Sequence, residues 1–239
     1  METADLSHHI SRRFNEDMER VRTRVLAMGG LVEDVLGKAI TSVVEGDSSL
    51  GESLAADDLK VNAMEVAIDE ECSRILATRS PAASDLRLIV AIIKTITDLE
   101  RIGDEASKIA RVAQKICESE RVYTPRFTEI KHMVGLVREM LRTALDAFAR
   151  LDLSKTVDLA RQDEQVDEQF RAATRQLITF MLEDPRTISM SLEVLFVAKA
   201  IERIGDHAKN IAEYVVYMVK GKDVRHTSVQ EMERETLQS

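Results

Sequence analysis

The chain has 239 residues, a formal net charge of −9, 4% aromatic residues, 9 glycines and 3 prolines. The acidic balance excludes nucleic acid as the main partner, because phosphate binding needs a surplus of Lys and Arg on one face. Scarce glycine and proline beside abundant Ala, Leu, Val, Glu, Arg and Lys are typical of helices. The composition therefore predicts an all-α protein with room for one large or two small domains.

No segment of the sequence has the pattern of a secretory signal or of a membrane-spanning helix. Residues 1–9 are polar, so we expect no secretory signal. The longest apolar stretch, 86–96, contains two cations and is far shorter than a bilayer span, so we expect a buried helix and no membrane insertion. Cys72 and Cys117 lack metal-type spacing, which predicts reduced thiols. We expect a cytoplasmic protein.

Helical periodicity predicts six long helices in chain order. They cover residues 11–44, 49–78, 84–117, 127–150, 154–182 and 189–219. Gly46 suits the left-handed residue that ends a helix. Pro81 and Pro185 mark the turns before the third and sixth helices, and Ser84 is a candidate N-cap. Beyond Gly221 we expect a frayed polar tail.

An internal repeat runs through the chain. The pentapeptide Glu-Arg-Ile-Gly-Asp occupies residues 100–104 and returns at 202–206, 102 positions later, and upstream segments match at an offset of 105. Short loops between long helices make neighbours antiparallel. The predicted fold is therefore two tandem, internally duplicated three-helix bundles, up-down-up, at residues 1–120 and 121–221, followed by a tail at 222–239.

The repeated motif predicts two groups of oxygen ligands. Glu and Asp four residues apart lie on one face of a helix. The second and third predicted helices fold back on each other at Pro81, and the fifth and sixth at Pro185. Residues equally far from such a turn lie at the same height along the two helices. The groups are Asp58, Asn62, Glu100 and Asp104 in the first unit, and Asp163, Asp167, Glu202 and Asp206 in the second. Converging carboxylates repel without a cation, and all-oxygen ligands suit Fe, Mn, Mg or Ca, with Zn also open.

A second interpretation of these positions is a solvated charged seam, neutralised by Arg101 and Arg203, which are also candidates for partner interaction. Gly103 and Gly205 cost helix stability, and either close helix packing or room for a metal or partner would explain them.

These residues together resemble the PhoU family of phosphate-signalling proteins. The resemblance rests on the two Glu-Arg-Ile-Gly-Asp helices and on the segment Pro-Ala-Ala-Ser-Asp-Leu-Arg-Leu at 81–88, and it covers about residues 14–220. It implies a negative regulator of the phosphate-starvation response, an adaptor without enzymatic activity. It also implies two partners, the sensor histidine kinase and the ATPase subunit of the phosphate ABC transporter. A homodimer is expected.

The resemblance also implies metal ions on the Glu/Asp-x-x-x-Asp motifs, which fall here on the two groups named above. Asn62 lacks a charge, so the first site is expected to be weaker. Asp98 has no counterpart, because Ala200 occupies that place, and His207 replaces Glu105.

Two other classes remain open. A carboxylate-bridged metalloenzyme or iron-handling bundle would use Glu-x-x-His motifs facing the core. The only such match is Glu129-Ile130-Lys131-His132, without a twin in the first unit. The other class is a helical scaffold without metal.

Overall fold

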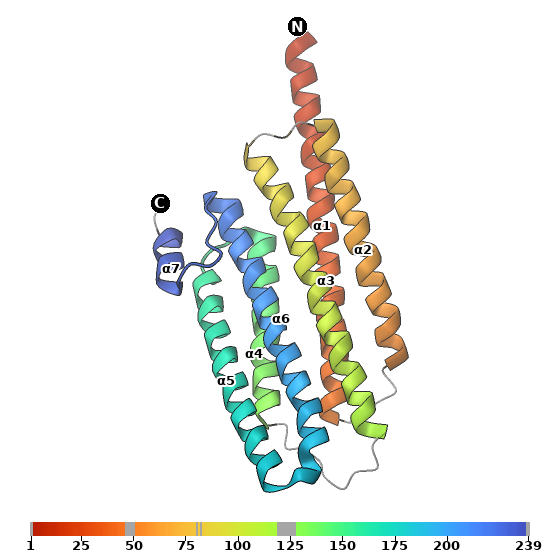
Figure 1. Ribbon diagram of the computed structural model, residues 1–239. Helices are drawn as coiled ribbons and strands as arrows, with labels where there is room; N and C mark the ends of the chain where they lie inside the picture. The colour runs from red at the N-terminus through yellow and green to blue at the C-terminus, as the bar shows by residue number, and fades with distance from the viewer. Residues whose placement is uncertain (1, 46–50, 80, 82, 119–127, 238–239) are drawn as a thin grey trace.

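The computed structural model describes residues 2–45, 51–79, 81, 83–118 and 128–237. Figure 1 shows long helices lying side by side, and the described residues contain no strand. In chain order they are α1 (Glu2–Glu45), α2 (Gly51–Arg79), α3 (Ala83–Glu118), α4 (Thr128–Arg150), α5 (Thr156–Glu183), the 3-10 turn η2 (Pro185–Thr187), α6 (Ile188–Lys220) and α7 (Val229–Leu237). None of these helices combines the length and apolarity needed to cross a bilayer. The predicted all-α class is confirmed.

The six long helices form two up-down-up sets (Figure 1). The first set is α1 to α3 and the second is α4 to α6, and the sets meet where α3 packs along α6 and α1 along α4. The buried apolar side chains of both sets form one continuous cluster. The predicted domain boundary at residues 120–121 lies outside the described residues.

Several predicted boundaries shift. Helix α1 begins at Glu2, nine residues before the predicted start, and Ser84 lies inside α3 rather than capping it, since that helix begins at Ala83. Gly46 lies outside the described residues. Helix α6 ends at Lys220, followed by Gly221 with a left-handed φ of 72°, a conformation that favours glycine.

The prediction of a frayed tail is wrong. Residues 229–237 form helix α7, which packs against α5. Val224 and Met232 are buried with Ala160 and Val216 in a small apolar cluster. The tail is polar overall, but the burial of its few apolar side chains against the second unit is enough to order it.

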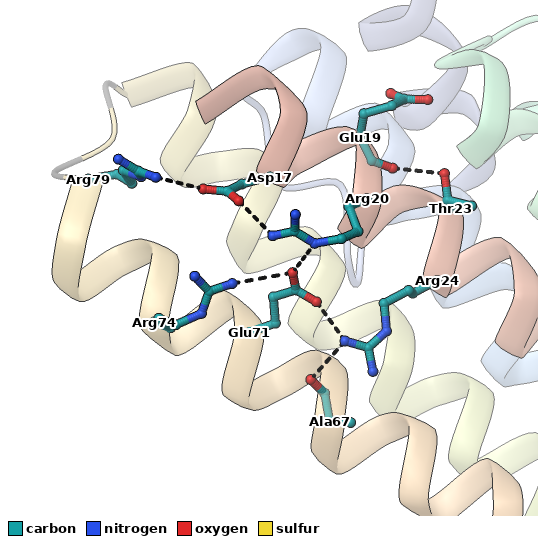
Figure 2. A network of polar contacts seen from close by, with 9 residues as sticks. All are labelled: Asp17, Glu19, Arg20, Thr23, Arg24, Ala67, Glu71, Arg74 and Arg79. Atoms are coloured by element: carbon teal, nitrogen blue, oxygen red, sulfur yellow. Dashed lines mark hydrogen bonds and ion pairs between the residues drawn. The ribbon is translucent and has the colours of Figure 1, made fainter. Parts of the chain in front are cut away.

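A polar network joins α1 to α2 (Figure 2). The buried Glu71 carboxylate accepts hydrogen bonds of 2.6 Å from Arg20 Nε and from Arg24 Nη1. Arg20 and Arg79 also donate to the buried Asp17. Burial alone would raise the pKa of Glu71, but the hydrogen bonds from Arg20 and Arg24 outweigh it and lower the pKa. The network therefore satisfies two buried carboxylates and fixes how α1 lies on α2.

Candidate functional site

The hairpin register predicted for α2 and α3 is confirmed by contacts on both sides of the first predicted ligand group. Thr97 Oγ1 donates to Glu65 Oε1 at 3.2 Å, and Ser107 Oγ donates to Asp58 Oδ1 at 2.9 Å. Since these contacts flank the positions of Asn62 and Glu100, these two residues lie at similar heights on the neighbouring helices.

In the first group, burial raises the pKa of Glu100, and the carboxylates of Asp104, of Glu65 outside the group, and of Asp58 raise it further. Arg101 Nε lies 3.7 Å from Glu100 Oε2 and opposes this shift. Asn62 Oδ1 is buried and has no hydrogen-bond partner in the described part of the chain. The group thus contains crowded negative charge and a buried oxygen that lacks a donor, which is unusual inside a protein.

In the second group the other three carboxylates act on Asp206. The Asp206 residue is exposed at the surface, but the surrounding protein partly removes its carboxyl from water, and Glu202, Asp163 and Asp167 add repulsion. Together, against the attraction of Lys209, they raise the pKa of Asp206 from 3.8 to about 6. At neutral pH the group therefore holds its charges at an electrostatic cost.

Three cations partly neutralise the second group. Lys209 Nζ donates to Asp163 Oδ2 at 2.7 Å, and Lys199 Nζ donates to Glu202 Oε1 at 2.6 Å. Arg171 Nη2 donates to Asp167 Oδ2 at 3.1 Å. The second group thus combines features of both interpretations, a converging ligand set and a charged seam. Across the described residues, no three His, Cys, Asp or Glu side chains are already arranged to hold a metal ion. Metal binding at either group stays a prediction.

Gly103 and Gly205 are both buried where helices pack closely. A Cβ atom on Gly103 would lie 3.4 Å from Val61, and one on Gly205 would lie 3.5 Å from Val137 and 3.6 Å from Val166. These are ordinary contact distances, so the helices pack closely at both positions but the packing does not require glycine.

The sequence reasoning missed a polar network between the two units. On α6, His207 Nδ1 lies 2.6 Å from Asp98 Oδ1 on α3, and Asn210 Nδ2 donates to the same oxygen at 3.2 Å. Tyr214 also contacts Asp98, and its pKa is raised by burial and by that carboxylate. The signal was present in the repeat itself, because Asp98 and His207 are two of the positions at which the halves differ.

Arg203 belongs to the same interface. Its Nη1 atom lies 2.8 Å from the buried Oε1 of Glu105, which Lys108 also contacts. The structure therefore gives Arg203 a role within the chain, whereas the equivalent Arg101 is exposed. A contact of either arginine with a partner stays a prediction.

The Glu-x-x-His motif does not face the core. His132 is exposed on α4, whereas the bundle metalloenzymes point this histidine inward. The side chain of Glu129 lies outside the described residues.

The PhoU domain family model matches residues 25–113 and 130–215, which include both groups of ligand candidates. A phosphate-specific transport system accessory protein PhoU homolog from Pseudomonas putida is 51% identical over 96% of this chain and 90% of its own length. The phosphate-specific transport system accessory protein PhoU of Escherichia coli K12 is 45% identical over 98% and 96%.

Solved structures agree with the sequence comparison. The crystal structure of PhoU from Pseudomonas aeruginosa is 49% identical, covers 87% of this chain and 100% of its own, and superposes with a TM-score of 0.84. The phosphate transport system regulatory protein PhoU from Streptococcus pneumoniae is 29% identical, covers 88% and 99%, and gives a TM-score of 0.81. With both halves matched by the family model and near full-length relatives in sequence and structure, this chain belongs to the PhoU family.

Proposed function

We propose that this chain is a negative regulator of the phosphate-starvation response, and that it acts as an adaptor without catalysis of its own. The observation that carries the proposal is the match over nearly the whole length to relatives named as accessory proteins of the phosphate-specific transport system. When phosphate is plentiful, the adaptor would report the state of the transporter to the kinase and keep the regulon off.

Two partners follow from this role, the sensor histidine kinase of the phosphate system and the ATPase subunit of the phosphate ABC transporter. Long helices such as α2 and α5 give the chain extended outer surfaces of the kind used to bind other proteins. The chain would then work in the cytoplasm, beside the membrane through these partners, and a homodimer is its expected form.

The regulatory role is tested by alkaline phosphatase activity in phosphate-rich medium. Deleting the gene from its host should raise the activity, and restoring it on a plasmid should silence it again. Low activity in both strains would contradict the proposal.

We further propose that the two carboxylate groups bind hard metal ions. The donor atoms are all oxygens, the buried Asn62 Oδ1 has no hydrogen-bond partner among the described residues, and the pKa of Asp206 is raised by burial and by three neighbouring carboxylates. Asp58, Asn62, Glu100 and Asp104 would hold one ion, and Asp163, Asp167, Glu202 and Asp206 another. A bound cation would neutralise these carboxylates. The α2–α3 hairpin would position the oxygens of the first group, and the α5–α6 hairpin those of the second.

Metal content of the purified chain, measured by mass spectrometry after loading with Mn²⁺ and dialysis, tests the second site. The double variant Glu202→Ala with Asp206→Ala should hold less metal than the wild type at unchanged helicity. Glu164→Ala with Glu168→Ala, on the exposed side of α5, is the matched control and should keep the metal. Equal metal in all three proteins would rule out this group as a site.

A further inference from the structure

A cleft of about 440 Å³ lies between α1 and α4, which are the first helices of the two units. Its lining comes from matching stretches of the repeat, residues 30–36 on α1 and 135–142 on α4. The proposed metal ligands all lie on the other four long helices, α2, α3, α5 and α6. The cleft is therefore separate from both carboxylate groups.

Two contacts fix how α1 and α4 lie beside each other at the cleft. Arg22 Nη2 donates to the carbonyl oxygen of Ala149 at 2.8 Å. Further along, Arg142 Nε lies 3.7 Å from Glu33 Oε1. Residue numbers thus rise along α1 while they fall along α4, so the two helices are antiparallel. Glu33 and Arg142 stand at similar heights on opposite edges of the cleft.

Two glycines in the cleft are not explained by packing within the chain. Gly30 and Gly135 both line it, both are exposed, and they are equivalent positions of the repeat. A Cβ atom on either glycine would meet no atom of the described chain within 4 Å. Glycine inside a helix is less stable than alanine, and one use that offsets this is the close approach of another molecule. The two glycines leave space for such an approach.

The two edges of the cleft carry opposite net charge. Glu33 and Asp34 stand on the α1 edge, whose lining contains no basic residue. Arg138 and Arg142 stand on the α4 edge beside the single acidic residue Glu139. Among the described residues the ion pair across the cleft is that of Arg142 with Glu33, whereas Asp34 and Arg138 have none. Each edge thus keeps a charge that a second molecule can neutralise.

We propose that two copies of this chain dock through the α1–α4 face, the exposed surface of α1 and α4 around the cleft. A two-fold interface brings the same patch from both copies together, so the patch must be complementary to itself. With the two-fold axis parallel to the helices, α1 of each copy lies on α4 of the other, and acidic edges meet basic edges twice. An axis across the helices would instead place like edges together. The proposal rests on the homodimer expected of the adaptor and assigns it a surface.

Size and charge balance favour a second copy over other occupants. Helices about 10 Å across that lie side by side over the 23 residues of α4 give a face of roughly 700 Å². Stable complexes bury about 800 Å² on each partner, so this face is near the required size. A purely basic or purely acidic partner would neutralise one edge and be repelled by the other, whereas a second copy neutralises both.

Sedimentation equilibrium of the full chain tests the proposal by charge reversal. Glu33→Arg with Asp34→Arg gives a chain with two basic edges, and Arg138→Glu with Arg142→Glu gives one with two acidic edges. The wild type should form a dimer, and each variant alone should have a dimer dissociation constant raised at least tenfold, because like charges then face each other. An equimolar mixture of the two variants should recover the dimer, since basic edges then meet acidic ones.

Two more variants complete the design. Glu164→Arg with Glu168→Arg reverses the same number of charges on the exposed side of α5 and is the matched control, which should dimerise as the wild type does. Gly30→Gln with Gly135→Gln leaves the charge unchanged but fills the space over the cleft. It should raise the dissociation constant at least tenfold, with a circular dichroism spectrum like that of the wild type.

A wild type that stays monomeric would overturn the proposal. So would a dimer that survives both reversals, a mixture that does not recover it, a glycine variant that dimerises normally, or a control that loses it to the same extent. The alkaline phosphatase test stands apart, because derepression in the deletion strain does not depend on which surface joins two copies.

Discussion

Arg203 Nη1 lies 2.8 Å from Glu105 Oε1 and joins the two halves of the molecule through a side chain of the repeated motif. Its repeat equivalent, Arg101, makes no ion pair with the other unit in the described structure and lies 3.7 Å from its neighbour Glu100 instead. One duplicated arginine has therefore become part of an interface, and the other has stayed on the surface.

Replacing Arg203 by Met should destabilise the fold. Glu105 is 3% exposed, and without Arg203 the one ion-pair partner left to its buried carboxylate among the described residues is Lys108, at 2.9 Å. We expect a loss of about 1–3 kcal/mol in the free energy of unfolding, because a buried charge loses a partner. Urea unfolding followed by circular dichroism measures it. Arg101→Met is the matched control and should change stability by less than about 0.5 kcal/mol.

The motif glycines should accept a methyl group. A Cβ atom on Gly103 or Gly205 meets neighbours no closer than 3.4 Å, so an alanine fits without movement. Because alanine favours helix over glycine, each single substitution should stabilise the protein by about 0.5–1 kcal/mol. Thermal unfolding tests this, with Gly29→Ala for comparison: there the new Cβ would lie 2.5 Å from Leu145 Cδ2 and should forfeit the gain.

Glu213 should make stability depend on pH. Burial, with smaller contributions from Asp163 and Asp223, raises the pKa of this carboxyl from 4.5 to about 7 against the opposing effect of Lys209. A pKa above the unfolded value means that the stabilising contribution is complete below about pH 4.5 and is lost as pH rises through 7.

Glu213→Gln should remove this dependence. The wild type should lose up to about 3 kcal/mol relative to the variant between pH 4.5 and 8. Urea unfolding of both proteins at several pH values measures the difference. A constant difference between the two proteins across this range would contradict the raised pKa.

The network of Figure 2 predicts a pH dependence of stability with the opposite sign to that of Glu213. The pKa of Glu71 is lowered by Arg20 and Arg24 despite burial, so its contribution is present above its unfolded pKa and is lost as pH falls through the folded value. Glu71→Gln should cost about 1–3 kcal/mol at pH 7, because two buried hydrogen bonds lose their charged acceptor. Glu70→Gln, the exposed neighbour, should be near neutral.

Local pattern and repetition were enough to predict the six long helices, the duplication and the register that brings Asp58 beside α3. Helical spacing and proline positions act over a few residues, so they can be read along the chain. The repeat also pointed to the family, because two copies of Glu-Arg-Ile-Gly-Asp in one helical chain are a long and specific pattern.

Only the tertiary structure decided which residues meet across the two units. Asp98 and His207 are 109 positions apart, and nothing in the local pattern pairs them. The same holds for Val224 and Met232, whose burial orders a tail that looks polar on its own. Contacts of this kind depend on how α3 lies on α6 and how α7 lies on α5, and that arrangement is set by the summed packing of whole helices rather than by any single segment.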